Sequence, residues 1–377
     1  MPGGRSASSF FTRLAEQTNA LGGALNAHLH LDRAGTLDDS YFGNRFRVLE
    51  NCHISLHEKH HRIHELHAGK AYEPSDLITR VERTLSIMTS QGVIRADTMV
   101  DTTDDQVGLT ALQTLRELKA GWRDRIDLRL AAYSPFGFKD SEPGRWRVFE
   151  KAARTADFLG ALPEADDRDE YPDHIGFDEH LTRMIDLARR RNMSLHVHVD
   201  QRNEASERRT ERLIEAVNRN VGPKSADGAP MVWAVHMISP STYDENRHRR
   251  LVDGLLDANI GVITCPSAAI GMRQLRAVNS PTFNSIPRIL DLLAAGVHVR
   301  VGCDNIDDIC SPSTTADLTD ELFILSAALR FYNTQVLARL ASGTLLSADE
   351  RALVIEHQRQ DQDEAARILN ALSGTSV

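Results

Sequence analysis

The segment NAHLHLDRA, residues 26–34, contains two histidines one residue apart, His28 and His30, followed by Asp32. Residues two positions apart face the same side of a β-strand, so the two imidazoles would converge on one point. Imidazole nitrogens are common ligands of divalent transition metals. The segment therefore indicates a metal centre, provided that the fold brings further ligands to the end of this strand.

Short runs rich in Val, Ile and Leu alternate with longer amphipathic stretches along most of the chain. The apolar runs predict eight strands, at residues 24–32, 92–101, 125–133, 157–163, 193–200, 231–236, 260–267 and 298–305. The amphipathic stretches predict helices at 74–92, 106–121, 145–156, 177–192, 204–219, 240–258, 282–295 and 316–331. Eight alternating units predict an α/β fold of the (β/α)8 TIM barrel type. An open doubly wound sheet is the alternative, but no G-x-G-x-x-G or Walker motif follows the first strand.

Catalytic groups of a barrel lie at the carboxyl ends of its strands. The polar residues at these predicted ends are His28, His30, Asp32, Arg33, Asp101, Tyr133, Ser134, Glu164, His196, His198, Asp200, Gln201, His236, Ser267, Asp304 and Asn305. Three imidazoles and one carboxylate would satisfy a divalent ion and leave room for a water molecule whose pKa the ion lowers. Spacing alone leaves open the choice between His196 and His198. It also leaves Asp307 and Asp308 as alternatives to Asp304.

Four segments resemble those of the amidohydrolase superfamily, within the branch that contains cytosine deaminase and the triazine-ring aminohydrolases. They are NAHLHLD (26–32), LHVHVDQ (195–201), WAVHMIS (233–239) and VGCDNIDD (301–308), in the order of the family. The resemblance covers residues 24–331, and four ordered motifs on eight predicted βα units are far more specific than a single H-x-H pair.

The resemblance implies a metal-dependent amidohydrolase with one Zn or Fe ion. The implied metal ligands are His28, His30, His198 and Asp304. His236 would hydrogen-bond the metal-bound hydroxide and the substrate, and Asp304 would also pass a proton from the attacking water to the leaving nitrogen. Asp32 and Asp200 resemble residues that orient the imidazoles from behind.

One position departs from the family pattern. Deaminases of this branch have a glutamate three residues after the strand-five histidine, where it protonates a ring nitrogen, but this chain has Gln201. An amide forms hydrogen bonds but cannot transfer a proton. Glu164 or Glu204 would have to replace the acid, unless the reaction needs none. We therefore favour hydrolysis of an amide or lactam, with cytosine deaminase-like release of ammonia from a heterocycle as the alternative and a catalytically silent, metal-free binding barrel as a third interpretation.

Further residues are expected to shape the site. Arg33, Tyr133 and Glu164 are predicted to contact the substrate, and the loop 134–140 to line the pocket. The segment DFLGALPEA lacks the lysine that bridges two ions in binuclear members of the superfamily, which favours a single ion. The alternative of two ions bridged by a carboxylate stays open, because Glu164 could supply that carboxylate.

The chain divides into an N-terminal extension (1–23), the barrel (24–331) with an insertion at 38–73, and a C-terminal helical segment (332–377). Neither end is expected to form the small β-sandwich of many relatives. The insertion has six histidines within residues 53–67, and His53, His57, His60 and His64 have helical spacing. They predict a second metal site or, as we favour, a lid helix over the barrel mouth.

Composition narrows the function classes. The 377 residues are 41% hydrophobic, with a formal net charge of −9 and no basic tract, so nucleic acid and anionic membranes are not expected partners. A small-molecule substrate, a homo-oligomer and a cytoplasmic location are expected, since no signal peptide or spanning run is evident. The four cysteines, Cys52, Cys265, Cys303 and Cys310, have no C-x-x-C pair and are expected to be reduced.

Overall fold

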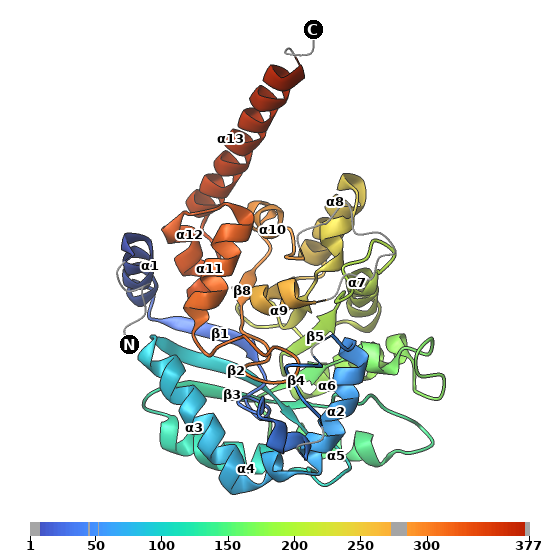
Figure 1. Cartoon of the computed structure of the whole chain (residues 1–377). Coiled ribbons are helices and arrows are strands. Elements are labelled where there is room, and N and C mark those ends of the chain that lie inside the picture. Colours follow the sequence, from blue (N-terminus) through green and yellow to red (C-terminus); the bar gives the residue numbers. More distant parts are fainter. Residues whose placement is uncertain (1–7, 44–45, 52, 273–284, 374–377) are drawn as a thin grey trace.

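The computed structural model describes residues 8–43, 46–51, 53–272 and 285–373. Eight parallel strands form one sheet whose order follows the chain (Figure 1). They are β1 (Ala24–Leu29), β2 (Val93–Asp101), β3 (Asp127–Tyr133), β4 (Phe158–Ala161), β5 (Leu195–Val199), β6 (Val232–His236), β7 (Ile260–Thr264) and β8 (Val299–Val301). The sheet closes because the Asp304 N–H donates to the His28 carbonyl at 2.9 Å and the His30 N–H donates to the Asp304 carbonyl at 3.2 Å. The predicted (β/α)8 barrel is confirmed.

Helices cover the outside of the barrel. They are α3 (Pro74–Ser90), α4 (Thr110–Trp122), α5 (Gly144–Ala152), α6 (Phe177–Arg191), α7 (Arg209–Asn220), α8 (Glu245–Asp257), α9 (Pro266–Gly271), α10 (Ile289–Ala295) and α11 (Leu318–Leu329). In α3, proline occupies the first position, where no intrahelical N–H bond is lost, and Leu77, Val81 and Leu85 recur on the buried face. The predicted helix 282–295 starts outside the described residues, and its described part contains α10.

One helix begins later than its sequence pattern predicts. The pattern predicts a helix over 204–219, but α7 starts at Arg209. The Asp200 carboxylate accepts hydrogen bonds from the backbone N–H groups of Arg209 at 2.7 Å and Thr210 at 3.0 Å, which satisfies the first turn of α7 there. The residues between Asp200 and Arg209 therefore form a loop at the barrel mouth.

Other elements lie outside the eight βα units. The insertion after β1 contains α2 (Leu56–His67) between two short helices, η2 (Asp39–Phe42) and η3 (Lys70–Tyr72), and two more short helices, η4 (Pro163–Asp166) and η5 (Ser239–Thr242), follow β4 and β6. The ends of the described chain form α1 (Ser9–Ala20), α12 (Thr334–Ser342) and α13 (Ala348–Ser373). Every strand in the described ranges belongs to the barrel, so no accessory β-sandwich is present in them. Among the described helices, none combines the length and apolar character that a membrane span requires.

Apolar side chains fill the barrel below its mouth. One interior cluster contains Leu25, Ala27, Trp233, Val235 and Ile263, and the other contains Met99, Ala131, Tyr133, Phe158 and Leu162. These layers form a solid floor, so the chemistry of the barrel is confined to the carboxyl ends of the strands. Cys265 and Cys303 are buried free thiols and Cys310 is a partly buried one, whereas Cys52 lies outside the described residues.

Candidate active site

Four buried side chains from four strand ends meet at the floor of the barrel mouth. They are His28 on β1, His198 on β5, His236 on β6 and Asp304 after β8, and one ligand atom of each lies within 4.8 Å of those of the others. The residues are widely separated in sequence, and only the closed sheet brings them together. Three nitrogens and one carboxylate oxygen are a donor set that suits Zn²⁺ or Fe²⁺.

The hydrogen bonds of these rings fit a metal ion. Both ring nitrogens of His28 are buried without a hydrogen-bond partner, as is Nδ1 of His236. Nδ1 of His198 lies 2.9 Å from the Ala161 carbonyl, to which it donates, and this leaves the Nε2 lone pair for an ion. An unpartnered buried imidazole is costly, and a bound cation would give a partner to one of the two His28 nitrogens.

His30 adjoins this cluster, and both of its ring nitrogens have polar neighbours. Its Nε2 lies 3.4 Å from Asp304 Oδ1, while Nδ1 accepts a hydrogen bond from the Arg33 guanidinium. A neutral ring that accepts at Nδ1 carries its proton on Nε2 and cannot ligate through that atom. The Arg33 contact and ligation by His30 through Nε2 therefore exclude one another, and Arg33 has to release the ring before His30 can join the ligand set.

Burial keeps the imidazoles neutral. Burial, and then the charge of Arg33, lower the pKa of His30 to about 3, and burial lowers the pKa of His236 to about 4. The pKa of His198 is lowered well below its usual value, again mainly by burial. Neutral imidazole is the form that binds metal ions, so the rings need lose no proton near neutral pH.

Two of the four residues leave their strands in an uncommon backbone conformation. His236 has φ +75° and Asp304 has φ +60°, both in the left-handed region. Non-glycine residues adopt this region at a cost of about 1 kcal/mol or more, and such residues are concentrated at functional sites. The turn at each strand end directs these two side chains across the barrel mouth.

Two residues that were alternatives as metal ligands, His196 and Asp308, lie outside the cluster. His196 faces the same side of β5 as His198 but lies in the floor, with its ring 4.6 Å from Phe158 and 6.4 Å from Trp233. The Asp308 carboxylate accepts hydrogen bonds from the backbone N–H groups of Cys310 at 2.8 Å and Ser311 at 3.0 Å, which caps a turn.

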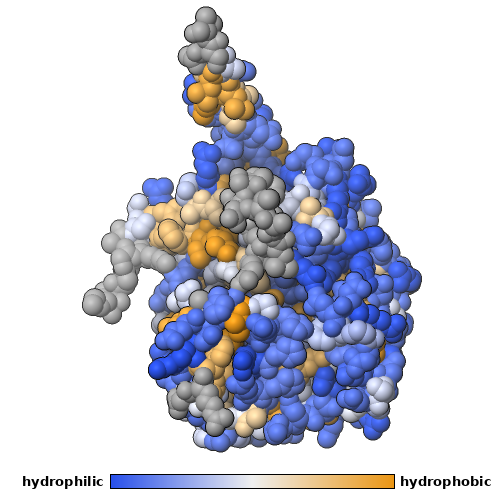
Figure 2. All heavy atoms as spheres, turned by 45° about the vertical axis from the view of Figure 1, so that its right-hand side comes forward, coloured by the Kyte–Doolittle hydropathy of each residue, from blue (hydrophilic) through white to orange (hydrophobic). Residues whose placement is uncertain are grey.

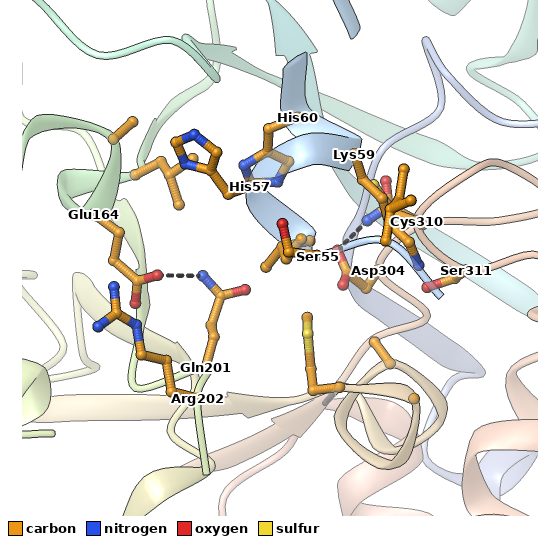
Figure 3. Close-up of a pocket in the computed structure, with 18 of the residues that line it drawn as sticks. Ser55, His57, Lys59, His60, Glu164, Gln201, Arg202, Asp304, Cys310 and Ser311 are labelled. Atoms are coloured by element: carbon orange, nitrogen blue, oxygen red, sulfur yellow. Dashed lines mark hydrogen bonds between the residues drawn. The ribbon is translucent and has the colours of Figure 1, made fainter. Parts of the chain in front are cut away.

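A cavity of about 530 Å³ opens above the cluster. Asp304 lines one side and Gln201 and Glu164 the opposite side, while α2 supplies His57, Lys59 and His60 from above (Figure 3). Leu162, Ile54 and Met272 add apolar wall. The volume is typical of a pocket for a small organic ligand, and the mixed lining suits a polar heterocycle.

Gln201 is paired with Glu164. Its Nε2 donates to Glu164 Oε2 at 3.1 Å, as the dashed line in Figure 3 shows. Burial raises the pKa of Glu164 to about 7, although the Arg209 guanidinium, 3.3 Å from Oε1, opposes the shift. A carboxyl group that carries a proton near neutral pH therefore lies beside the amide. Glu204, the other candidate acid, lines a separate groove with Arg208 and Arg209.

Arg33 and Tyr133, which were predicted to contact the substrate, are not among the residues that line the cavity, and neither is His236. Arg33 is buried, with Nε 4.0 Å from Asp101 Oδ2, and its guanidinium is directed to His30. The Tyr133 ring lies 5.3 Å from His30 and 5.4 Å from His198, so it packs behind these imidazoles. Both residues support the histidines and do not face the cavity, because their strand-end positions point into the interior of the barrel.

Asp32 and Asp200, which were predicted to orient the imidazoles, accept hydrogen bonds from backbone and hydroxyl groups. Asp32 Oδ2 accepts from the Asp101 N–H at 2.7 Å and from the Tyr72 hydroxyl at 3.2 Å, and Asp200 caps α7. Among the described residues, no hydrogen bond joins either carboxylate to an imidazole of the cluster. Both carboxylates hold the loops that carry the site, so they position it indirectly.

The helical spacing of the histidines in the insertion predicted a helix at the barrel mouth, but not which of its side chains would line the cavity. His57, Lys59 and His60 line the cavity, whereas His64 stacks on Phe136 at 3.7 Å. His67 lies between Asp101 (3.0 Å) and Asp105 (2.6 Å). Burial opposes protonation of this ring, but the hydrogen bonds that it donates to the two carboxylates raise its pKa to about 9. The useful signal was position, because a loop after a barrel strand lies at the mouth.

The eight-stranded barrel of this chain is also the fold of a solved deaminase. The chain resembles a solved 5-methylcytosine deaminase from Klebsiella pneumoniae, with a TM-score of 0.67 and 23% identity over 89% of this chain and 82% of that one. At this identity the likeness establishes the fold. The resemblance to the cytosine deaminase-like amidohydrolases is thereby confirmed.

Sequence comparison finds two relatives. An uncharacterized protein of Haemophilus influenzae is 27% identical over 267 residues, which are 70% of this chain and 87% of that protein. A pterin deaminase of Rhizobium rhizogenes is 22% identical over 237 residues, or 63% of this chain. The match spans about half, 51%, of the pterin deaminase. No family model matches the chain.

Proposed function

We propose that the protein is a metal-dependent hydrolase that cleaves a carbon–nitrogen bond other than a peptide bond in a small nitrogen heterocycle. The observation that carries the proposal is the meeting of His28, His198, His236 and Asp304 at four strand ends, where Asp304 also lines a cavity. The fold shared with a 5-methylcytosine deaminase and the sequence similarity to a pterin deaminase support the class of reaction.

The two oxygens of Asp304 have different neighbours, and this suggests a division of roles. Oδ1 lies 3.6 Å from His28 Nε2 and 3.4 Å from His30 Nε2, whereas Oδ2 lies 3.9 Å from His236 Nε2. We assign His28, His30, His198 and Asp304 as ligands of a Zn²⁺ or Fe²⁺ ion, which when bound would lower the pKa of a water molecule. Asp304, which lines the cavity, would accept the transferred proton and pass it on, and His236 Nε2 lies 3.9 Å from its Oδ2.

The Gln201–Glu164 pair bears on the choice between amide cleavage and deamination. Gln201 alone cannot donate a proton to a ring nitrogen, which favours amide or lactam cleavage. Glu164 Oε2 lies 3.1 Å from the amide and its pKa of about 7 keeps part of the carboxyl protonated near neutral pH. The pair therefore supplies both a hydrogen-bond partner for the ring and a proton, and deamination becomes the version that we favour.

The metal requirement has a direct test. We expect purified protein to contain about one Zn or Fe ion per chain, because one cluster of buried ligands is present among the described residues. Elemental analysis before and after treatment with a chelator measures the ion, and readdition should restore hydrolysis. Protein that folds without metal, and binds none when Zn²⁺ or Fe²⁺ is supplied, would instead support a silent binding barrel.

The substrate class is tested by ammonia release. We expect release from an amino-substituted pterin, pyrimidine or triazine by the native protein, measured against cyclic ureas, lactams and acylated amines in the same screen. A cavity of about 530 Å³ has room for a bicyclic ring. Amine or acid formation from the acylated compounds, without ammonia from any aromatic ring, would restore amide cleavage as the better assignment.

The role of Glu164 predicts the pH dependence. Its folded pKa of about 7 lies above the usual 4.5, so the protonated donor is present below pH 7 and is lost as pH rises through that value. Activity should fall roughly tenfold per pH unit above this point. Glu164→Gln should lower kcat by about 10²-fold or more and remove this limb of the profile.

Glu170→Gln is the matched control, because Glu170 lines the same cavity but is paired with Arg202. This variant should keep the wild-type pH profile. If the alkaline limb survives in Glu164→Gln, another group supplies the proton and Glu164 has only a binding role.

A further inference from the structure

The last helix of the described chain leaves the body of the protein. Figure 1 shows α13 projecting away from the barrel, and every residue from Arg359 to Ser373 is exposed. Its contacts with the body end near Asp361, which pairs with Arg330 at 3.3 Å, after Gln358, which donates to Asp291 at 2.6 Å. We call residues 362–373 the overhang. At 1.5 Å per residue it is about 18 Å long.

The overhang carries an apolar stripe. Ile368, Leu369 and Leu372 are 44%, 65% and 64% exposed, and with Ala365 they have the i, i+3, i+4, i+7 spacing of one helix face. Figure 2 shows hydrophobic atoms near the end of the projecting helix. A helical segment of this length is marginal in water by itself, so a stripe of this kind indicates a surface that is covered in the native assembly.

The stripe continues the face with which α13 packs on its own body. Val354 is buried, and Gln358 and Asp361 contact the body. Together with the stripe, these residues form the series 354, 358, 361, 365, 368 and 372, whose steps of four and three residues define a coiled-coil seam. The first half of the seam packs on the body of the same chain, and Ala365 and Ile368 in the second half are exposed.

We propose that the overhang docks on the overhang of a second copy of this chain, antiparallel and around a two-fold axis. The axis would pass between residues 366 and 367. It would set Ala365 of each copy against Ile368 of the other, which pairs a small residue with a large one and allows close approach of the helices.

The same axis brings the tip of each overhang to a notch on the other copy. Leu372 of one copy would lie opposite Asp361 of its mate, at the edge of a notch of about 220 Å³ between α13 and the body. Ile289, Leu290 and Leu329 line this notch, together with His357. The chain therefore offers both the stripe and a partly apolar recess at the distance that the pairing requires.

Charge argues against a membrane as the occupant. The polar side of the overhang carries Asp363 and Glu364 against the single cation Arg367. Helices that bind anionic lipid surfaces have Lys and Arg on the polar face, so the overhang lacks the usual attraction. A second copy needs no such charge, since its stripe is apolar as well.

The experiment compares two double variants by sedimentation velocity over a concentration series. Ile368→Ala/Leu369→Ala removes the stripe but keeps residues that favour a helix. Arg367→Ala/Asn370→Ala, on the opposite side of the same helix, is the matched control. Wild type and control should reach twice the 42.0 kDa of one chain, and the stripe variant should remain at half that mass. Circular dichroism verifies that all three have equal helix content.

Three outcomes would overturn the proposal. They are a wild-type protein of single-chain mass at every concentration, a stripe variant that dimerises like wild type, and a control that dissociates like the stripe variant. A pure protein that stays monomeric but carries a different bound protein when isolated would assign the stripe to that partner. None of these results depends on hydrolysis, so the proposed function is tested separately.

Discussion

Asp304→Asn is expected to lower kcat/KM by about 10⁴-fold and to lower the metal content of the purified protein. The carboxylate lies between His28 and His30 on one side and His236 on the other. An asparagine amide has nearly the same shape, but its NH₂ group donates hydrogen bonds and neither oxygen nor nitrogen accepts a proton at neutral pH. Steady-state kinetics on the substrate found by the screen, with elemental analysis of the same samples, measures both effects.

Asp308→Asn separates loss of chemistry from loss of structure. Asp308 lies on the same loop and is buried, but its carboxylate accepts backbone hydrogen bonds from Cys310 and Ser311. Activity within a few-fold of wild type, and an unchanged metal content, are expected for this variant. Equal losses in the two variants would mean that any carboxylate of the loop is needed to hold it, and the specific role of Asp304 would be wrong.

Gly302→Ala is expected to lower the free energy of unfolding by about 3 kcal/mol and to weaken metal binding. A Cβ at Gly302 would lie 2.6 Å from the carbonyl oxygen of His28 and 2.7 Å from its nitrogen. These are backbone atoms of β1, so no side chain can rotate aside and β8 must move away. Because Asp304 follows two residues later, the same shift separates its carboxylate from His28. Denaturant unfolding and metal content measure the two consequences.

Gly121→Ala is the matched control for this change. Gly121 lies in α4, and a Cβ there would have nothing within 4 Å. Alanine at such a position should raise the free energy of unfolding by up to about 1 kcal/mol, because it favours the helix and restricts the unfolded chain. If Gly302→Ala unfolds at the wild-type denaturant concentration and holds its ion equally well, the barrel tolerates a shift of β8 away from β1. The prediction would then be wrong.

The regular spacing of apolar residues identified the barrel, because burial of the strands and of one face of each helix requires apolar residues at fixed intervals. The strand at 193–200 and the helix at 74–92 are recognisable from their apolar patterns alone, and the structure contains both as β5 and α3. Strand ends are also local features, but only the resemblance to the amidohydrolases favoured His198 over His196 and Asp304 over Asp307 and Asp308. The start of α7 was missed because it depends on Asp200 binding the N–H groups of Arg209 and Thr210. That contact is tertiary, and propensity does not contain it.

The sequence by itself determined the number of βα units and the residue types at their ends, because these follow from local periodicity. Only the tertiary structure decided which side chains face the cavity: it paired Gln201 with Glu164, put Arg33 and Tyr133 behind the imidazoles, and extended α2 over the mouth. The physical reason is that closure of the sheet sets the depth and direction of each strand end. Depth separates His198 from His196, although both face the same side of β5.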